Sequence, residues 1–183
     1  MNTERQILFA GFGGQGVLSM GKFLTYAAMG IGKNVSYLPS YGAEMRGGTA
    51  NCLVTIADEE ISSPLTDNPD MAIVLNRPSM DRFEGKVKPG GTLIINTSLV
   101  DRLPERSDLL VYQLPVNQIA DDMGSSGAAN MILLGAWLQK TQVVPVDQTL
   151  GLFDVIFKGK KQAVIARNRD AFQVGVQYAN DNW

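Results

Sequence analysis

The stretch that decides the fold is Ile7-Leu8-Phe9-Ala10-Gly11-Phe12-Gly13-Gly14-Gln15-Gly16-Val17, which joins an apolar run to a cluster of glycines. The apolar run from Gln6 to Ala10, closed by glycine, predicts a buried strand. Gly11, Gly13 and Gly16 have the G-x-G-x-x-G spacing of a turn that leads from a strand into a helix. Backbone amides at the start of such a helix can face a phosphate, so this turn is also the first candidate site.

The glycine turn opens a strand-helix-strand unit. Apolar residues recur every three or four positions from Val17 to Ile31, which predicts a helix buried along one face, and a second strand is predicted from Asn34 to Leu38. A turn that binds a dinucleotide needs an Asp or Glu at the end of the second strand to hold the ribose hydroxyls. No acidic residue occurs between Glu4 and Glu44, which argues against NAD or FAD. A structural turn, or a turn with another ligand, is left open.

A second phosphate-binding pattern can be tried on the same residues. Gly16, Gly21 and Lys22 satisfy the G-x-x-x-x-G-K spacing of a P-loop. Phe23, however, stands where a P-loop carries the hydroxyl that binds magnesium, and the intervening residues belong to the predicted helix rather than to a loop. We therefore reject a P-loop in this chain.

A second glycine-rich segment runs from Ser40 to Gly48 and has neither a helical nor a strand period. It follows the second predicted strand, and open parallel sheets bind their ligands at the carboxyl ends of their strands. Tyr41, Glu44 and Arg46 offer hydrogen-bonding side chains, and an arginine can pair with a phosphate or a carboxylate in fork geometry. The Gly47-Gly48 pair lets another backbone approach closely. A loop that only packs against its neighbour is an equally good interpretation of each residue.

The rest of the chain alternates strands with helices, which predicts an α/β fold of the Rossmann-like, doubly wound kind with a mostly parallel sheet. An antiparallel hairpin is expected after the first unit, formed by a strand at 50–56 and the segment 61–64. The C-terminal third is expected to be helical, and residues 1–183 are taken as a single domain because no linker or repeat divides them. The remaining predicted elements are strands at 71–75, 92–95 and 109–113 and helices at 78–83, 130–138, 146–157 and 162–179.

Composition limits the chemistry of the chain. Its 183 residues carry a net charge of -2, so no overall field attracts nucleic acid or an anionic membrane. The chain has no histidine, and its single cysteine, Cys52, cannot form an intrachain disulfide, a zinc site or an iron-sulfur cluster. Redox or metal chemistry would therefore need a cofactor on another chain. The apolar segments are too short to span a membrane and no signal peptide is recognised, so we expect a cytoplasmic location.

A basic cluster of lysines and arginines lies late in the chain. Such runs are most often solvated helix ends, and a surface for a phosphate or a partner is the second interpretation. The members of the cluster are Lys158, Lys160, Lys161, Arg167 and Arg169.

Four segments together carry a resemblance that covers the whole chain. They are Gly11 to Val17, Ser40 to Gly48, Asn76-Arg77-Pro78-Ser79 and Gly127-Ala128-Ala129-Asn130-Met131. In them the chain resembles the gamma subunit of 2-oxoacid:ferredoxin oxidoreductases, the family that acts on pyruvate, 2-oxoglutarate or 2-ketoisovalerate. The resemblance implies a non-autonomous subunit of an enzyme that oxidatively decarboxylates a 2-oxoacid with coenzyme A, giving acyl-CoA and carbon dioxide and passing electrons to ferredoxin.

The resemblance also implies a division of labour in a hetero-oligomer. Thiamine diphosphate with magnesium lies between alpha and beta subunits and iron-sulfur clusters lie on other chains or domains, so this chain alone is expected to bind no cofactor or metal and to supply no catalytic residue. The expected partners are the alpha and beta subunits, a delta subunit where there is one, and ferredoxin through the complex. We expect one surface, on the coenzyme A side or against the partner subunits, built from Gly13, Gly14, Gln15, Gly16, Tyr41, Glu44, Arg46, Gly47 and Gly48.

Two other classes of function stay open at this point. One is a stand-alone nucleotide-binding or regulatory module of Rossmann-like fold, which would bind its ligand through the glycine turn. The other is a scaffold whose glycine loops bind only protein.

Overall fold

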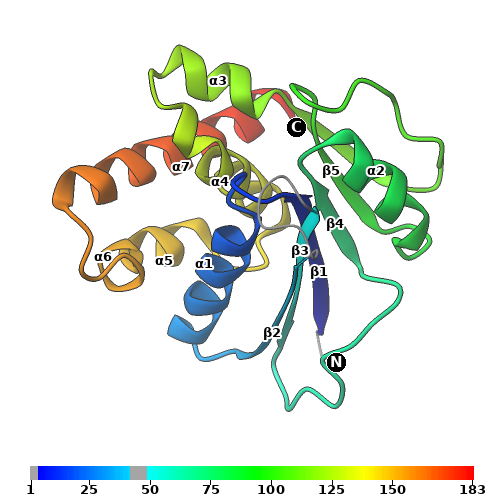
Figure 1. Cartoon of the computed structure of the whole chain (residues 1–183). Coiled ribbons are helices and arrows are strands. Elements are labelled where there is room, and N and C mark those ends of the chain that lie inside the picture. Colours follow the sequence, from blue (N-terminus) through cyan, green and yellow to red (C-terminus); the bar gives the residue numbers. More distant parts are fainter. Residues whose placement is uncertain (1–3, 42–48) are drawn as a thin grey trace.

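The computed structural model describes residues 4–41 and 49–183, and Figure 1 shows one twisted sheet with helices on both of its faces. Its elements in chain order are β1 (Arg5–Phe12), α1 (Val17–Gly30), β2 (Asn34–Tyr41), β3 (Thr49–Ala57), β4 (Met71–Val74), α2 (Arg77–Phe83), η1 (Glu84–Lys86), β5 (Thr92–Asn96), β6 (Leu110–Leu114), α3 (Val116–Asp122), η2 (Ser126–Ala128), α4 (Ala129–Thr141), α5 (Val146–Gly151), α6 (Phe153–Ile156) and α7 (Gln162–Asn182). Within these residues no helix is at once long enough and apolar enough to cross a bilayer.

The six strands lie in the order β2-β3-β1-β4-β5-β6. β1, β4, β5 and β6 pair in parallel, whereas β3 is antiparallel to both β1 and β2. β1 and β2 therefore run in the same direction with β3 between them. The predicted mostly parallel α/β sheet is confirmed.

Alternate residues of β1 enter two separate cores, as the period of a strand requires. Ile7 and Phe9 pack on the face that α1, α4 and α7 cover, where the Phe9 ring meets Trp137 edge-on at a centroid distance of 5.8 Å. Leu8 and Ala10 pack on the opposite face against Met80 and other residues beneath α2. Figure 1 shows the same division, with most helices on one side of the sheet and α2 on the other.

The core on the larger face depends on a close crossing of α4 and α7. A Cβ atom at Gly135 would lie 2.0 Å from the carbonyl oxygen of Phe172, and one at Gly175 would lie 1.8 Å from that of Ile132. The two backbones are therefore in direct contact. The apolar run at 130–138 is buried on nearly every side, as its sequence predicted.

The antiparallel hairpin differs from the predicted one. β3 pairs with β2 and β1, and residues 58–70 form no strand. β2 continues through Pro39 to Tyr41 instead of ending at the proline, because it is an edge strand, where a missing N–H is tolerated. β3 pairs with strands that lie far from it in the sequence or precede it, and the alternation of apolar and polar residues within 50–56 does not indicate which strands these are.

One predicted helix is corrected, and one helix was missed. The stripe from Val146 to Phe157 was expected to form one helix, but the helix breaks after Gly151 into α5 and α6. α3 was not predicted; it follows Pro115 and has only seven residues, too few to show a helical period.

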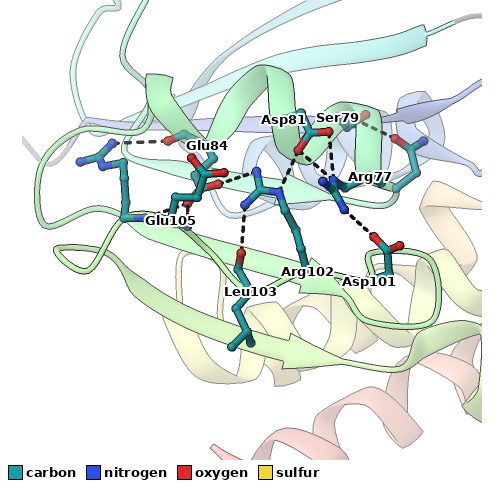
Figure 2. Close-up of polar contacts among 10 residues, drawn as sticks. Arg77, Ser79, Asp81, Glu84, Asp101, Arg102, Leu103 and Glu105 are labelled. Carbon is teal, nitrogen blue, oxygen red and sulfur yellow. Dashed lines mark hydrogen bonds and ion pairs between the residues drawn. The ribbon is translucent and has the colours of Figure 1, made fainter.

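A network of charged side chains fastens the segment 97–109 to α2 (Figure 2). Arg102 lies between Asp81 and the buried Glu84, with nitrogen-oxygen distances of 2.8 and 2.7 Å. Glu84 Oε1 also accepts hydrogen bonds from the backbone N–H groups of Glu105 and Arg106. Burial alone would raise the pKa of Glu84, but these donors, with the Arg102 guanidinium, lower it.

Candidate functional site

A crevice lies outside the carboxyl ends of β1, β4 and β5. The chain leaves β1 for α1 on one face of the sheet and leaves β4 for α2 on the other, so the space between these strand ends is a topological switch point. A cavity of about 170 Å³ occupies it. It is lined by Gly14, Gln15, Leu75, Asn96, Val116, Asn117, Ser126, Gly127, Ala129 and Asn130.

Gln15 closes the glycine turn onto the end of β4. Its side-chain Oε1 accepts a hydrogen bond from the Phe12 N–H at 2.6 Å and another from Asn76 Nδ2 at 2.8 Å. Its Nε2 donates to the carbonyl oxygen of Leu75 at 3.5 Å. Gln15, which the sequence predicted as a site residue, therefore also links the ends of β1 and β4 through hydrogen bonds.

A row of amide side chains continues from Gln15 across the strand ends. Asn76 caps α2 by accepting the Ser79 N–H at 3.0 Å. Asn96 Nδ2 donates to the Leu75 carbonyl at 3.2 Å and to Asn117 Oδ1 at 2.8 Å. Asn76 and Asn96 are almost completely buried, and buried amides are stable only when hydrogen-bonded in this way. Among the described residues, the floor of the crevice is thus polar and carries hydrogen-bonded amides rather than charged side chains.

The glycines of the first turn have separate roles. Gly16 has a φ of 80° and precedes α1, and a Cβ atom there would lie 2.4 Å from Asn130 Nδ2. Gly14 has a φ of 96° but open space around it; Gly13 and Gly14 are both exposed, and Gly14 lines the crevice. The glycine at position 16 therefore permits helix α4 to approach the turn, whereas positions 13 and 14 leave the backbone exposed.

The second glycine-rich segment begins at the same edge of the sheet. The register places Tyr41, Ala50 and Gly11 in one row across β2, β3 and β1, so the two segments leave strand ends that are about 10 Å apart. The remaining predicted residues of this segment, Glu44, Arg46, Gly47 and Gly48, lie outside the described residues, as does the side chain of Tyr41.

The position of β3 distinguishes this sheet from a dinucleotide-binding unit. In a dinucleotide-binding unit the second strand lies next to the first, and its terminal carboxylate reaches the ribose. Here β3 separates β1 from β2, and β2 itself contains no acidic residue. The strands β1 and β2 are therefore not adjacent, and β2 carries no carboxylate that could hold a ribose.

Cys52 is held away from solvent in the folded chain. Its side chain is completely buried, and its sulfur lies 3.6 Å from the carbonyl oxygen of Val17. Burial raises the pKa of the Cys52 thiol to about 12, and a hydrogen bond to the Gly21 backbone only partly opposes this. In the ranges 4–41 and 49–183 no group of three or more His, Cys, Asp or Glu residues is arranged to hold a metal ion.

Sequence reasoning missed most of the amides that line the crevice. Gln15 was a predicted site residue, but Asn96, Asn117 and Asn130 were not. Asn96 comes directly after the buried run 92–95, so a polar residue at the carboxyl end of a predicted strand was the available signal. Asn117 and Asn130 lie at the starts of helices, and only the fold brings them to the crevice.

Two curated relatives place the chain in a family. The sequence pattern of the family described as pyruvate ferredoxin/flavodoxin oxidoreductase matches residues 6–178. The chain is 37% identical to ketoisovalerate oxidoreductase subunit VorA of Methanothermobacter marburgensis, with 98% of this chain covered, but it spans only 37% of the length of VorA. The 2-oxoglutarate synthase subunit KorC of Methanocaldococcus jannaschii is 31% identical, and the alignment covers 99% of this chain and 97% of KorC.

Solved structures agree with these relatives. The keto/oxoacid ferredoxin oxidoreductase gamma subunit from Geobacter sulfurreducens is 29% identical with a TM-score of 0.81, covering 97% of this chain and 99% of that one. The 2-oxoglutarate:ferredoxin oxidoreductase from Magnetococcus marinus, solved with 2-oxoglutarate, coenzyme A and succinyl-CoA bound, is 26% identical with a TM-score of 0.88 and covers 98% of this chain and 32% of that one. The resemblance to a gamma subunit is confirmed, and the chain belongs to the pyruvate ferredoxin/flavodoxin oxidoreductase family.

Proposed function

We propose that this chain works as the gamma subunit of a multi-subunit 2-oxoacid:ferredoxin oxidoreductase. The complex would oxidatively decarboxylate a 2-oxoacid with coenzyme A, release acyl-CoA and carbon dioxide, and pass electrons to ferredoxin. Thiamine diphosphate, magnesium and iron-sulfur clusters would be held by alpha, beta or further subunits. The family match over residues 6–178 is the observation that carries this proposal.

The crevice is suited to binding a ligand rather than to transferring protons or electrons. Its polar side chains are amides and a serine, which exchange hydrogen bonds but do not titrate near neutral pH. Coenzyme A contributes a thiol that accepts the acyl group, and its pantetheine arm contains amides that match amide side chains. We therefore propose that Gln15, Asn117 and Asn130, with the exposed backbone at Gly13 and Gly14, hold and orient coenzyme A at the face that meets the partner subunits.

The second glycine segment is proposed to complete this surface. Its start at Tyr41 lies at the same sheet edge as the glycine turn. Arg46 would pair with a phosphate of coenzyme A or with a carboxylate of a partner subunit. The chain would act within the cytoplasm, where ferredoxin is reduced.

The reconstituted complex tests this role. Omitting the chain should abolish coenzyme A-dependent reduction of ferredoxin by the 2-oxoacid, and adding it back should restore the reaction. Replacing Arg46 by Ala should raise the KM for coenzyme A or weaken assembly, as measured by kinetics and analytical ultracentrifugation. Unchanged kinetics and assembly in the Arg46→Ala complex would remove Arg46 from the proposed surface.

A stand-alone nucleotide-binding module is disfavoured by the insertion of β3 between β1 and β2. Calorimetric titration of the isolated chain with NAD, FAD, ATP and coenzyme A separates the two functions. We expect no tight binding of NAD or FAD. Submicromolar binding of either dinucleotide would favour the free module instead.

A further inference from the structure

In the part of the chain that the structure describes, the α2 side of the sheet is only partly covered by helix. α1 packs on β2 and β3 from one face, whereas α2, on the other face, packs on β1 and β4 (Figure 1). On that second face Leu38 lies opposite Leu53, and Ser40 lies opposite Asn51. Ser40 is exposed and the other three are half-buried. Apolar and polar side chains of β2 and β3 therefore remain accessible here.

A groove of about 210 Å³ extends from this accessible sheet face to the end of α2. Residues of β1, β2 and β3 form its floor, and residues of α2, η1 and the loop 58–70 form its sides. We call it the β2–β3 groove. Its floor includes Ser40, which directly precedes Tyr41, where the second glycine segment begins. The groove therefore reaches the edge of the sheet that is proposed to meet partner subunits.

Arg82 and Lys86 supply two cations to one side of the β2–β3 groove. Their charged groups lie 5.1 and 5.8 Å from the centre of the Phe83 ring, which is within cation–π range. Neither charged group forms an ion pair or a hydrogen bond with a residue in the ranges 4–41 and 49–183. Like charges four residues apart on a helical segment repel each other. A bound carboxylate would remove this repulsion.

Neighbouring cations on the same side of the sheet differ from this pair because they have carboxylate partners. They are Arg77, Lys88, Arg102 and Arg106, each within 3.0 Å of an Asp or Glu oxygen. Asp67 supplies a carboxylate to the lining of the groove, but it pairs with neither Arg82 nor Lys86. Within the described residues, these two cations are thus left for a partner from outside the chain.

The groups in the β2–β3 groove match a polypeptide better than they match a free anion. Arg82 and Lys86 can bind carboxylate side chains, and Asp67 and Asn51 can accept hydrogen bonds from peptide N–H groups. Leu53 offers an apolar contact on the floor. A free phosphate would be repelled by Asp67 and would leave this apolar floor uncovered. The lining therefore favours an acidic segment of protein.

We propose that the β2–β3 groove binds an acidic segment of a partner subunit, with Asp or Glu side chains on Arg82 and Lys86 and an apolar side chain on Leu53. This inference rests on the proposed function for the existence of a partner subunit. The contact would lie on the face of the sheet and would add to the contact proposed at the glycine segments. Because it pairs accessible charges, salt should weaken it.

Charge reversal in the reconstituted complex tests this contact. Arg82→Glu and Lys86→Glu should each weaken assembly about tenfold or more at low salt, and less at high salt, as measured by analytical ultracentrifugation. In the isolated chain Arg82→Glu should be no less stable to urea than the wild type, because Glu and Lys four residues apart attract each other. Arg167→Glu is the matched control, since Arg167 is an exposed arginine of α7 outside the groove. It should assemble like the wild type.

The outcomes separate this proposal from the proposed function. If the wild-type chain assembles with thiamine- and cluster-bearing chains and both reversals assemble equally well, the docking site is wrong and the proposed function stands. If the wild-type chain assembles with no such chain, the proposed function fails. Equal assembly together with stabilisation of the wild type alone by inorganic phosphate would assign the groove to a free anion and overturn the proposal.

Cross-linking in the purified complex identifies what occupies the groove. Ser40→Cys places a thiol on the floor of the groove, and the completely buried Cys52 does not compete for a thiol reagent. A benzophenone attached at position 40 should link, on illumination, to an Asp- or Glu-containing segment of an alpha, beta or delta subunit, which mass spectrometry identifies. A link to a second copy of this chain, a link to a segment without carboxylates, or no link in the assembled complex would contradict the proposal.

Discussion

At the scale of single residues, glycine is required at positions 14 and 16 for two different reasons. Both have a positive φ, but only at Gly16 would a Cβ atom meet another residue, Asn130 Nδ2 at 2.4 Å. Gly14→Ala should cost about 1–2 kcal/mol for the left-handed backbone, and Gly16→Ala should cost about 1 kcal/mol more because the Asn130 side chain, and α4 with it, must give way. Urea unfolding of both variants measures the difference. Equal losses would show that α4 does not pack on the turn as described.

Glu84 gives a residue-scale prediction about pH. Because its pKa is lowered in the folded chain, its contribution to the free energy of unfolding is complete above about pH 5 and is lost as the pH falls through the folded pKa. Glu84→Gln should therefore destabilise the chain by about 1–3 kcal/mol at pH 7 and by less below pH 4. Urea unfolding across this range measures the difference. A deficit that grows on acidification would contradict the network in Figure 2.

Cys52 should be inert while the chain is folded. Its pKa of about 12 and its complete burial leave almost no accessible thiolate at pH 8. A chromogenic disulfide reagent should label it only as fast as the chain unfolds and should label it fully in denaturant. Rapid labelling of the native chain would mean that α1 separates from β3.

At the scale of elements, the crossing of α4 and α7 is the contact most sensitive to size. Gly175→Ala would place a methyl group 1.8 Å from a backbone carbonyl, which neither helix can accept without separating. We expect a loss of about 3 kcal/mol or more in the free energy of unfolding, or failure to fold. Gly151→Ala, with open space around its Cβ, is the control and should change stability by about 0.5 kcal/mol or less. Similar stability of the two variants would contradict the close crossing.

The elements also show how far sequence reasoning reaches. β4, β5 and α4 were predicted because each is a continuous buried run, so its own composition reports its surroundings. The predicted partner of β3 was wrong because strand pairing depends on segments far apart in the chain. Helix α3 was missed because seven residues are too few to show a helical period. The residues of the crevice show the same limit. Gln15 could be predicted from its sequence motif, whereas Asn117 and Asn130 are brought to the crevice only by the fold.

At the scale of the whole molecule, the crevice and the starts of both glycine segments lie at one edge of the sheet. Among the described residues, the strand ends that carry a cofactor in other doubly wound sheets here carry amide side chains, and the sequence contains no histidine to transfer protons. We therefore expect the reacting groups to come from partner subunits that dock at this edge.

Purification of the chain at native expression level, with mass spectrometry of what accompanies it, tests this account most directly. We predict that chains bearing thiamine diphosphate and iron-sulfur clusters copurify with it, and that the purified complex reduces ferredoxin only when a 2-oxoacid and coenzyme A are both present. A chain that purifies alone, and that binds a dinucleotide tightly in that state, would contradict the account.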